Sequence, residues 1–421
     1  MPMSTDYSNR LNKTFLNDIA EHFGTPFHVY DEKGIKETGH QLIEAFKNIE
    51  GFREYFAVKA LPNPSIMKIM HELSFGFDCS SVPELVLARE AGATGEDIMF
   101  TSNNTSPEDF DFAEKDGGCI LNLDDITLVD KVPKMPEMVC FRYNPGSRRT
   151  GNDIIGNPVE AKYGVSHEQV VEAYRKVKDA GAKRFGIHTM LASNELNYKY
   201  MVETSKMILD MVRMVSDKLD IQFDFVNIGG GLGIPYKPED EALDIVAMGQ
   251  EITALFDEFK KERGYCPKLY LESGRFMTGP HGVLAVTAIN RKDIYRSYVG
   301  VDACMSALMR PGLYGAYHHI TIPGKEDAPL NTTVDVVGSL CENNDKFAVQ
   351  RNLPVIEEND ILLIHDTGAH GHAMGFNYNA KMRPKELLLK ENGNVTLIRR
   401  EETMADYFAT LNFAEDTYGK N

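Results

Sequence analysis

A lysine at the end of an apolar segment indicates covalent chemistry. Lys59 follows Tyr55-Phe56-Ala57-Val58, part of a strand predicted over residues 54–58. A lysine at such a position is expected to be desolvated, which favours the neutral amine, and only a neutral amine attacks a carbonyl to form an imine. An ordinary surface lysine at a strand end would give the same pattern, so this residue alone does not establish a function.

A glycine-rich segment follows another predicted strand, at residues 223–228. Gly229-Gly230-Gly231 would allow backbone amides to approach a phosphate closely. Residue 234 is Ile, so the dinucleotide-binding pattern GxGxxG is absent. A phosphate cradle and a simple glycine-rich turn both remain open.

Glu272 and Arg275 lie at the end of the strand predicted at residues 268–272. A carboxylate beside a pyridine nitrogen keeps that nitrogen protonated, so that the ring can accept electrons. Arg275 could bind a carboxylate or a phosphate. The plain alternative is a local surface ion pair, which contributes little stability.

Two clusters near the C-terminus also carry reactive side chains. Cys341 could donate a proton and Glu342 could bind an ammonium, although a lone cysteine is more often a buried structural residue. His365, His370 and His372 resemble metal ligands in type, but their spacing matches no strong zinc pattern. We therefore expect no metal site.

Repeated strand-then-helix units from about residue 50 to 275 must position these side chains. Such repeats predict a parallel sheet, and their number favours a closed, TIM-like α/β barrel. Lys59, Asp78, His188, Gly229 and Glu272 all fall at the ends of predicted strands. A parallel barrel builds its active site at that end of its strands.

The pattern changes after about residue 280, where predicted strands follow one another with no long helices between them. This change predicts a second, mainly antiparallel β-domain. An early strand at residues 27–31 could join either domain.

The length and composition fit a two-domain globular protein. The chain has 421 residues, 43% of them hydrophobic, and a net charge of -17, which argues against a nucleic-acid partner. Its six cysteines show no CxxC spacing, which argues against a disulfide framework and fits a reducing cytoplasm. The N-terminus lacks the apolar region of a signal peptide, and the longest apolar run, residues 283–289, is far shorter than the ~20 residues of a membrane-spanning helix.

Seven segments occur in a fixed order along the chain: YFAVKALPNP, FDCSS, NIGGGLGIPY, ESGRFMTGPHG, MRPGLYGAYHHI, GSLCENNDKFA and DTGAHGHAMGFNYN. Together they resemble the fold-type-III pyridoxal-phosphate decarboxylases, and most closely the diaminopimelate decarboxylases, from about residue 26 to 408. The resemblance implies a pyridoxal-phosphate-binding α/β barrel at residues 36–280 and a β-domain at 281–421, which residues 1–35 join. It also implies a homodimer with active sites at the subunit interface.

The resemblance implies a role for each candidate residue. Lys59 would form the imine with pyridoxal 5'-phosphate, His188 would stack on the ring, and Glu272 would contact the ring nitrogen. The remaining cofactor contacts would be Asp78, Gly229, Gly230, Gly231, Gly274, Arg275 and Tyr378. The substrate contacts would be Arg275, Arg310, Tyr314, Glu342 and His370. Cys341 would reach in from the partner subunit and return a proton to the substrate Cα.

The chain departs from the family pattern at several positions. The common HIGS is His188-Thr189-Met190-Leu191 here, EPGR is ESGR, CESGD is CENND, and the tyrosine of GAYG is His370. The serine that contacts phosphate in the family is thus absent, although Ser193 is near. These changes concern phosphate binding and the distal substrate pocket, and they leave Lys59, Glu272 and Cys341 in place.

The resemblance favours decarboxylation of meso-diaminopimelate to lysine in lysine biosynthesis. This substrate carries a second carboxylate that Arg275 and Arg310 could bind, whereas ornithine or lysine offers none at that end. A second hypothesis is a decarboxylase of the same fold for another amino acid or for carboxynorspermidine. A third is a cofactor-binding regulator without catalysis. A racemase is disfavoured, because alanine racemases of this fold class have an arginine in place of Glu272.

Overall fold

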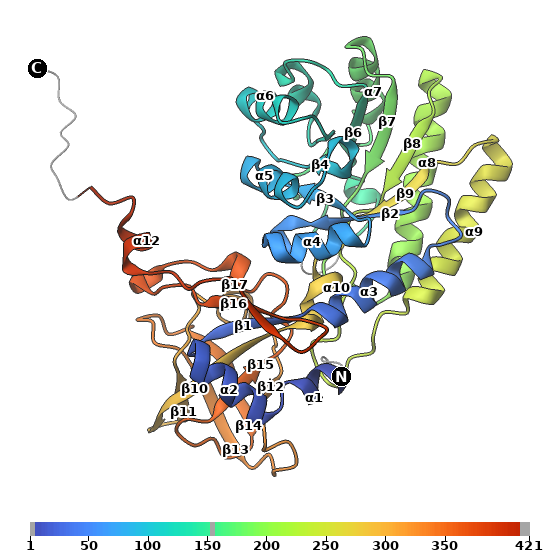
Figure 1. The fold of residues 1–421 in the computed structure, drawn as a ribbon. Coiled ribbons are helices and arrows are strands. Elements are labelled where there is room, and N and C mark those ends of the chain that lie inside the picture. Colours follow the sequence, from blue (N-terminus) through green and yellow to red (C-terminus); the bar gives the residue numbers. More distant parts are fainter. Residues whose placement is uncertain (1–4, 152–155, 413–421) are drawn as a thin grey trace, which may run out of the picture.

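A closed barrel of eight parallel strands forms the larger part of the computed structural model, which describes residues 5–151 and 156–412 (Figure 1). The strands follow chain order around the barrel, and the last pairs with the first. They are β2 (Arg53–Ala57), β3 (Gly76–Cys79), β4 (Ile98–Phe100), β5 (Ile120–Leu123), β6 (Met138–Arg142), β7 (Arg184–His188), β8 (Phe223–Asn227) and β9 (Lys268–Leu271). The expected α/β barrel is confirmed.

Helices surround the barrel and begin where the sequence supplies caps. In α6, the Ser106 hydroxyl accepts a hydrogen bond from the Asp109 amide, and the Asp109 carboxylate accepts one from the Ser106 amide. This capping box contributes about 1 kcal/mol. In the longest helix, α8, the Asn197 side chain accepts a hydrogen bond from the Lys199 amide. The helices are α3 (Glu32–Ala45), α4 (Pro64–Glu72), α5 (Val82–Glu90), α6 (Pro107–Lys115), α7 (Val170–Asp179), α8 (Tyr198–Leu219), α9 (Ile245–Arg263) and the short α10 (Arg275–Thr278).

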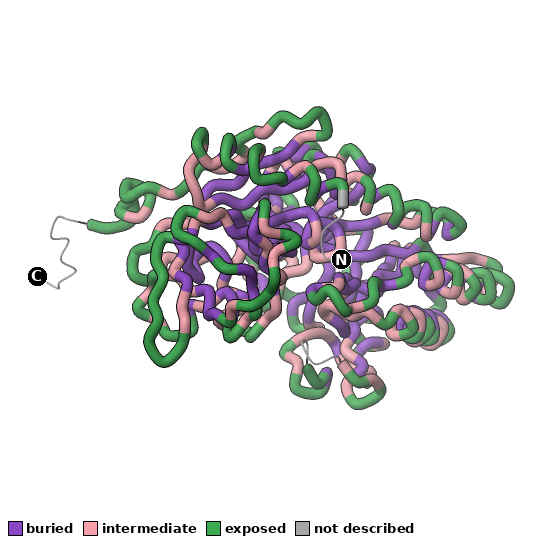
Figure 2. Tube along the Cα trace, turned by 90° about the horizontal axis from the view of Figure 1, so that it is seen from below, coloured by how far each residue is buried: buried purple, intermediate pink, exposed green. Residues whose placement is uncertain are grey.

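The barrel interior is apolar in its lower part, toward the amino ends of the strands, and polar in its upper part, at their carboxyl ends. A buried cluster of inward-facing side chains fills its lower part: Tyr55, Met99, Ile120, Met138, Cys140, Phe225 and Tyr270. Gly186 makes room for this cluster, because a Cβ there would lie 2.0 Å from the Phe225 ring. Figure 2 shows the strands buried and the outer sides of the helices exposed. Polar side chains end several strands, so the carboxyl end of the barrel is the end equipped for chemistry.

The second part of the molecule is a nine-stranded mixed sheet in the order β14-β13-β11-β10-β1-β16-β17, with β15 beside β10 and β12 beside β15. Among the described strands of this sheet, only the β1–β16 and β11–β13 pairs are parallel, so the sheet is mainly antiparallel, as expected. The strands are β1 (Phe27–Asp31), β10 (Gly282–Asp293), β11 (Ser297–Val301), β12 (Ile320–Thr321), β13 (Thr332–Val337), β14 (Lys346–Leu353), β15 (Ile361–Ile364), β16 (Lys385–Leu389) and β17 (Val395–Arg399).

The first strand of the chain belongs to this sheet. Phe27 pairs with Ala285 of β10 on one side and with Lys385 of β16 on the other. Leu11, in the turn between α1 (Thr5–Arg10) and α2 (Lys13–Phe23), and Leu16 of α2 are buried against the same sheet. The N-terminal segment is thus tied to strands more than 250 residues away in sequence. The domain boundaries near residues 36 and 281 stay a prediction.

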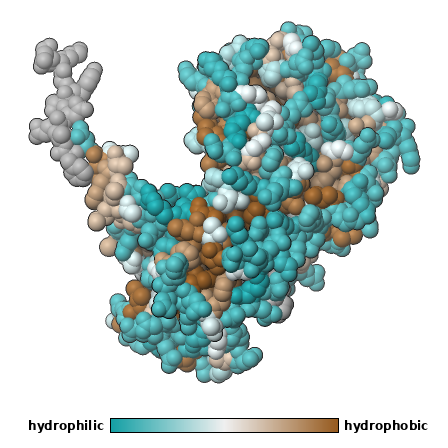
Figure 3. Space-filling model, viewed as in Figure 1, coloured by the Kyte–Doolittle hydropathy of each residue, from teal (hydrophilic) through white to brown (hydrophobic). Residues whose placement is uncertain are grey.

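Two short helices complete the second part. α11 (Arg310–Tyr314) packs beside β14, and α12 (Met404–Phe408) projects from the body of the molecule (Figure 1). The surface is mostly hydrophilic in Figure 3, and hydrophobic residues gather along the hollow between the barrel and the sheet. None of the helices in the described ranges is long and apolar enough to cross a membrane.

Candidate active site

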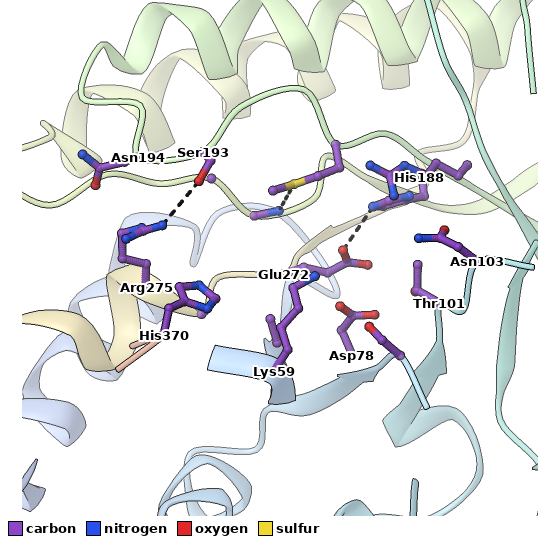
Figure 4. Close-up of a pocket in the computed structure, with 17 residues that line it drawn as sticks. Lys59, Asp78, Thr101, Asn103, His188, Ser193, Asn194, Glu272, Arg275 and His370 are labelled. Carbon is purple, nitrogen blue, oxygen red and sulfur yellow. Dashed lines mark hydrogen bonds and ion pairs between the residues drawn. The ribbon is translucent and has the colours of Figure 1, made fainter. Parts of the chain in front are cut away.

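A pocket opens at the carboxyl end of the barrel and gathers many of the predicted residues (Figure 4). They come from the ends of β2, β3, β7 and β9, from the glycine loop after β8, and from a loop of the second part. The predicted residues that line the pocket are Lys59, Asp78, His188, Gly230, Gly231, Glu272, Gly274, Arg275 and His370.

Lys59 lies in the pocket but not in the environment that the sequence suggested. Strand β2 ends at Ala57, and Lys59 occupies the 3-10 turn Val58–Ala60 that follows. Its side chain is exposed within the pocket, so the expectation of a desolvated amine is wrong. The turn is the physical reason, because it lifts the side chain out of the apolar strand and toward Glu272 and Asp78 (Figure 4).

Glu272 is the centre of a buried polar group. Its carboxylate accepts hydrogen bonds from Asn227 Nδ2 at 2.7 Å and from His188 Nε2 at 3.1 Å. Because a carboxylate only accepts, Nε2 of His188 carries the hydrogen in this contact. Burial raises the pKa of Glu272, but the interactions with His188, Lys59 and Asn227 outweigh it and hold the pKa below its usual value. Glu272 is therefore a buried, ionised carboxylate at the floor of the pocket.

Asp78 is the second carboxyl group of the pocket and behaves differently. Burial and the negative charge of Glu272 raise the pKa of Asp78 to about 8, against the opposing effect of Lys59. Its Oδ1 atom is buried without a hydrogen-bond partner among the described residues, and so is Nδ1 of His188. Buried polar atoms normally have a hydrogen-bond partner, so these two atoms are available to a bound ligand.

The glycine loop lies too close to its neighbours to carry side chains. A Cβ on Gly230 would lie 2.2 Å from the carbonyl oxygen of Glu272, and one on Gly231 would lie 2.4 Å from that of Ala192. The Gly230 amide donates only to the Met190 sulfur, at 3.2 Å. Sulfur is a weak hydrogen-bond acceptor, so this amide is available to a stronger acceptor such as a phosphate oxygen.

Arg275 and Arg310 converge on one phenol. Nη1 of Arg275 and Nη1 of Arg310 both donate to the hydroxyl oxygen of Tyr236, the latter at 2.9 Å. Arg275 also donates to Ser193 Oγ at 3.4 Å. Among the described residues both guanidiniums hydrogen-bond to neutral partners, although Arg310 is buried. Two neighbouring positive charges without a counter-ion form a site for an anion.

Six predicted residues do not line this pocket. Two of them lie beside it, because Gly229 adjoins the lining residue Gly230, and Arg310 shares Tyr236 with Arg275. The other four differ in exposure. Cys341, Tyr314 and Tyr378 are exposed, and Glu342 is half-buried. The Cys341 amide donates to Asn379 Oδ1 at 2.7 Å, so the loops that carry Cys341 and Tyr378 are joined. The exposed position of Cys341 also excludes the alternative of a buried structural cysteine. A single chain thus does not bring these residues to Lys59.

The three histidines of the HDTGAHGH segment do not form a metal site. His365 contacts Thr321 Oγ1 at 2.7 Å, and His372 contacts the Pro384 carbonyl at 3.0 Å, whereas His370 lines the pocket. In residues 5–151 and 156–412 no group of three or more histidine, cysteine or acidic side chains could hold a metal ion.

Several residues of the site escaped the sequence analysis. Arg142 and Asn227 end strands β6 and β8, so the same strand-end rule would have found them. Tyr236 follows the glycine loop within a quoted segment, but nothing in its spacing signals the two arginines. The other pocket residues that the sequence analysis did not name as candidates are Ala57, Ser80, Thr101, Asn103 and Asn194.

Comparison with known proteins identifies the family of this chain. Residues 34–279 match the model of the pyridoxal-dependent decarboxylase, pyridoxal-binding domain. Protein TabA of Pseudomonas amygdali pv. tabaci is 45% identical over 97% of this chain and 96% of its own length. A diaminopimelate decarboxylase of Methanothermobacter thermautotrophicus is 35% identical over 92% of each chain.

A solved structure agrees with these relatives. The diaminopimelate decarboxylase of M. jannaschii, in complex with L-lysine, matches with a TM-score of 0.86 and 29% identity over 94% of each chain. The chain therefore belongs to the pyridoxal-phosphate-dependent decarboxylases that share the fold of diaminopimelate decarboxylase.

Proposed function

We propose that this protein decarboxylates meso-diaminopimelate to L-lysine and carbon dioxide, as a step of lysine biosynthesis. The observation that carries the proposal is the arginine pair on Tyr236, beside the Lys59 pocket and without a carboxylate partner. A substrate with a second carboxylate supplies the missing negative charge. Lysine and ornithine carry no such group at the end distant from their α-carbon.

The pocket residues fit pyridoxal phosphate. The cofactor needs an amine for its aldehyde, a carboxylate for its ring nitrogen and donors for its phosphate. Lys59 would supply the amine, Glu272 the carboxylate, and the Gly230 amide and the Ser193 hydroxyl the donors. Asp78 Oδ1 and His188 Nδ1, which are buried without a hydrogen-bond partner, are also available to the bound cofactor.

Each residue has a defined task in the proposed reaction. When bound, pyridoxal phosphate supplies a conjugated ring that accepts the electron pair of the breaking Cα–carboxylate bond. Glu272 holds its negative charge beside the ring position, and His188 and Asn227 hold Glu272 in place. Carbon dioxide leaves, and the thiol of Cys341 delivers one proton to Cα. Solvent then returns a proton to the thiolate, so one carbon dioxide is released for each proton taken up.

The proposed reaction requires a homodimer. The pocket of a single chain is not lined by Cys341, Glu342, Tyr314 or Tyr378. We assign them to the active site of a partner subunit, where Glu342 would bind the distal ammonium of the substrate and Cys341 would reach Cα. The exposure of Tyr314 (63%) and Tyr378 (52%) supports a surface that a second copy covers.

A second candidate is a decarboxylase of the same fold for another amino acid or for carboxynorspermidine. The observation that favours it is the pocket itself, because Met190 and His370 line it at positions where the family commonly has glycine and tyrosine. The 45% identity to TabA, whose name states no substrate, also leaves this candidate open.

A substrate panel separates the two candidates. The protein is loaded with pyridoxal phosphate, and kcat/KM is measured for meso-diaminopimelate, L-lysine, L-ornithine, L-arginine and carboxynorspermidine. The proposal predicts that meso-diaminopimelate is preferred by at least about 100-fold, equivalent to about 2.7 kcal/mol. A higher kcat/KM for any other member of the panel contradicts it.

A further inference from the structure

Tyr236 holds two guanidinium groups that would otherwise repel each other. Its hydroxyl oxygen accepts from Arg275 Nη1 and Arg310 Nη1, so both lone pairs are used. Its ring also lies beneath them, with the Arg310 guanidinium carbon 4.9 Å and the Arg275 guanidinium carbon 5.7 Å from the ring centre. The phenol is buried at 8% exposure. Its own hydrogen has no acceptor within the described part of the chain, and is free to donate to an anion.

His318 fixes the second guanidinium from the other side. Its Nδ1 atom lies 2.7 Å from the carbonyl oxygen of His365, and a carbonyl can only accept. Nδ1 therefore carries the hydrogen, and Nε2, 2.9 Å from Nη1 of Arg310, is the acceptor. Burial and the charge of Arg310 lower the pKa of His318 to about 3, which agrees with a neutral ring. The His318 ring also meets the Tyr236 ring edge to face, at 5.3 Å between centres.

Both partners of the arginine pair are neutral acceptors. A carboxylate in either place would cancel the positive charge that a substrate anion needs. Asp366 raises the pKa of Arg310 against the larger lowering effect of burial, but burial also raises the pKa of Asp366 itself well above its usual value, which favours its neutral form. The arrangement thus fixes the geometry of the two guanidiniums and leaves their charge uncompensated.

The geometry points to Tyr236 and His318 as positioning residues that hold Arg275 and Arg310 as one site for the distal carboxylate of the substrate. This inference rests on the proposed function, because it needs a substrate or product with that carboxylate. The loop after β8 brings Tyr236, and α11 together with the segment before β12 brings Arg310 and His318. The pair therefore also links the barrel to the second part of the molecule at the substrate site.

Ligand binding tests the inference without turnover. The probes are L-lysine and 1,5-diaminopentane. L-lysine is the proposed product, and it keeps the carboxylate at the end distant from the carbon that loses carbon dioxide, whereas 1,5-diaminopentane has no carboxylate. Each is titrated into the pyridoxal-phosphate-loaded protein, and the dissociation constant is read from the change of the cofactor absorbance. We expect wild type to bind L-lysine at least about tenfold more tightly than 1,5-diaminopentane.

The variants are chosen to separate positioning from folding. Tyr236→Phe keeps the ring and removes the hydroxyl, and His318→Leu removes the acceptor, whereas His318→Gln keeps an acceptor at the Nε2 position. Tyr317→Phe is the matched control, because its hydroxyl contacts His319 and neither arginine. We expect Tyr236→Phe and His318→Leu to weaken L-lysine binding about tenfold or more, with 1,5-diaminopentane unchanged. His318→Gln should regain most of the affinity, and Tyr317→Phe should match wild type.

The possible results lead to different conclusions. If wild type prefers L-lysine and Tyr236→Phe keeps that preference, the positioning role is wrong and the proposed function stands. Equal loss of both ligands, with an unchanged cofactor spectrum, also overturns the positioning role. If wild type shows no preference for L-lysine, the distal-carboxylate site is wrong, and the proposed function falls with it.

Discussion

Nε2 of His188 lies 3.1 Å from the carboxylate of Glu272, and both side chains are almost completely buried. Together with Asn227 and Lys59, this contact keeps Glu272 ionised against the cost of burial. A buried negative charge at this place matters, because the reaction depends on a ring that attracts electrons. The charge is fixed before any substrate arrives.

Replacing that charge should impair catalysis more than cofactor binding. Glu272→Gln keeps the shape and one hydrogen-bond acceptor but removes the negative charge. We expect kcat to fall about 100-fold or more, equivalent to about 2.7 kcal/mol, while the cofactor absorbance band remains. Glu251→Gln, on the surface beside Lys199, is the control and should match wild type. A kcat within threefold of wild type for Glu272→Gln would show that the charge is not needed.

Asp78 should make the stability of the cofactor-free protein depend on pH. Its folded pKa of about 8 lies above the unfolded value near 3.8, so the folded state binds the extra proton between these values. Its contribution to stability is therefore complete below about pH 4 and is lost as pH rises through about 8. Asp78→Asn cannot ionise, so the melting temperature of the variant should rise relative to wild type between pH 5 and pH 8.5. A difference that stays constant over this range contradicts the assignment.

Arg310 should contribute strongly to substrate recognition. Arg310→Ala removes one of the two guanidiniums on Tyr236, and we expect kcat/KM for meso-diaminopimelate to fall by ~2–4 kcal/mol, roughly 30- to 1000-fold. Arg175→Ala is the control, since Arg175 pairs with Glu172 on the exposed side of α7, away from Tyr236. Unchanged turnover in Arg310→Ala means that the distal carboxylate binds elsewhere.

Shared active sites predict complementation between two inactive variants. In Lys59→Ala the pocket is defective, and in Cys341→Ala the contribution to the partner is defective. After subunit exchange in an equal mixture, half of the dimers carry one intact site, so activity should recover to about a quarter of wild type. The two variants measured separately set the baseline. A mixture no more active than that baseline shows that Lys59 and Cys341 do not act across an interface.

Much of the fold could be predicted from the sequence, because the signals were local. Helix α8 spans Tyr198–Leu219, and both its cap, Asn197, and its regular apolar face can be recognised in the sequence. Strand β14 is difficult to predict because its burial pattern does not alternate, which reflects register shifts in its pairing with β13. Strand β16 is a short apolar run buried throughout, and such a run alone does not separate a strand from a helix.

The site was predictable where a residue ends a strand and unpredictable where contacts are distant. Asp78, His188 and Glu272 follow from the barrel rule. Lys59 was placed in the pocket for the right reason, but a local 3-10 turn gave it exposure instead of burial. Tyr236 could not be recognised, because its partner Arg310 is 74 residues away and in the other part of the molecule.

The most direct test of the proposed function is the stoichiometry of products from meso-diaminopimelate. The protein is loaded with pyridoxal phosphate and incubated with the substrate, and carbon dioxide and L-lysine are measured together. We predict equal molar amounts of both products from wild type and neither from Lys59→Ala. Release of neither product by the wild-type holoenzyme, or release of carbon dioxide without lysine, would contradict the proposed function.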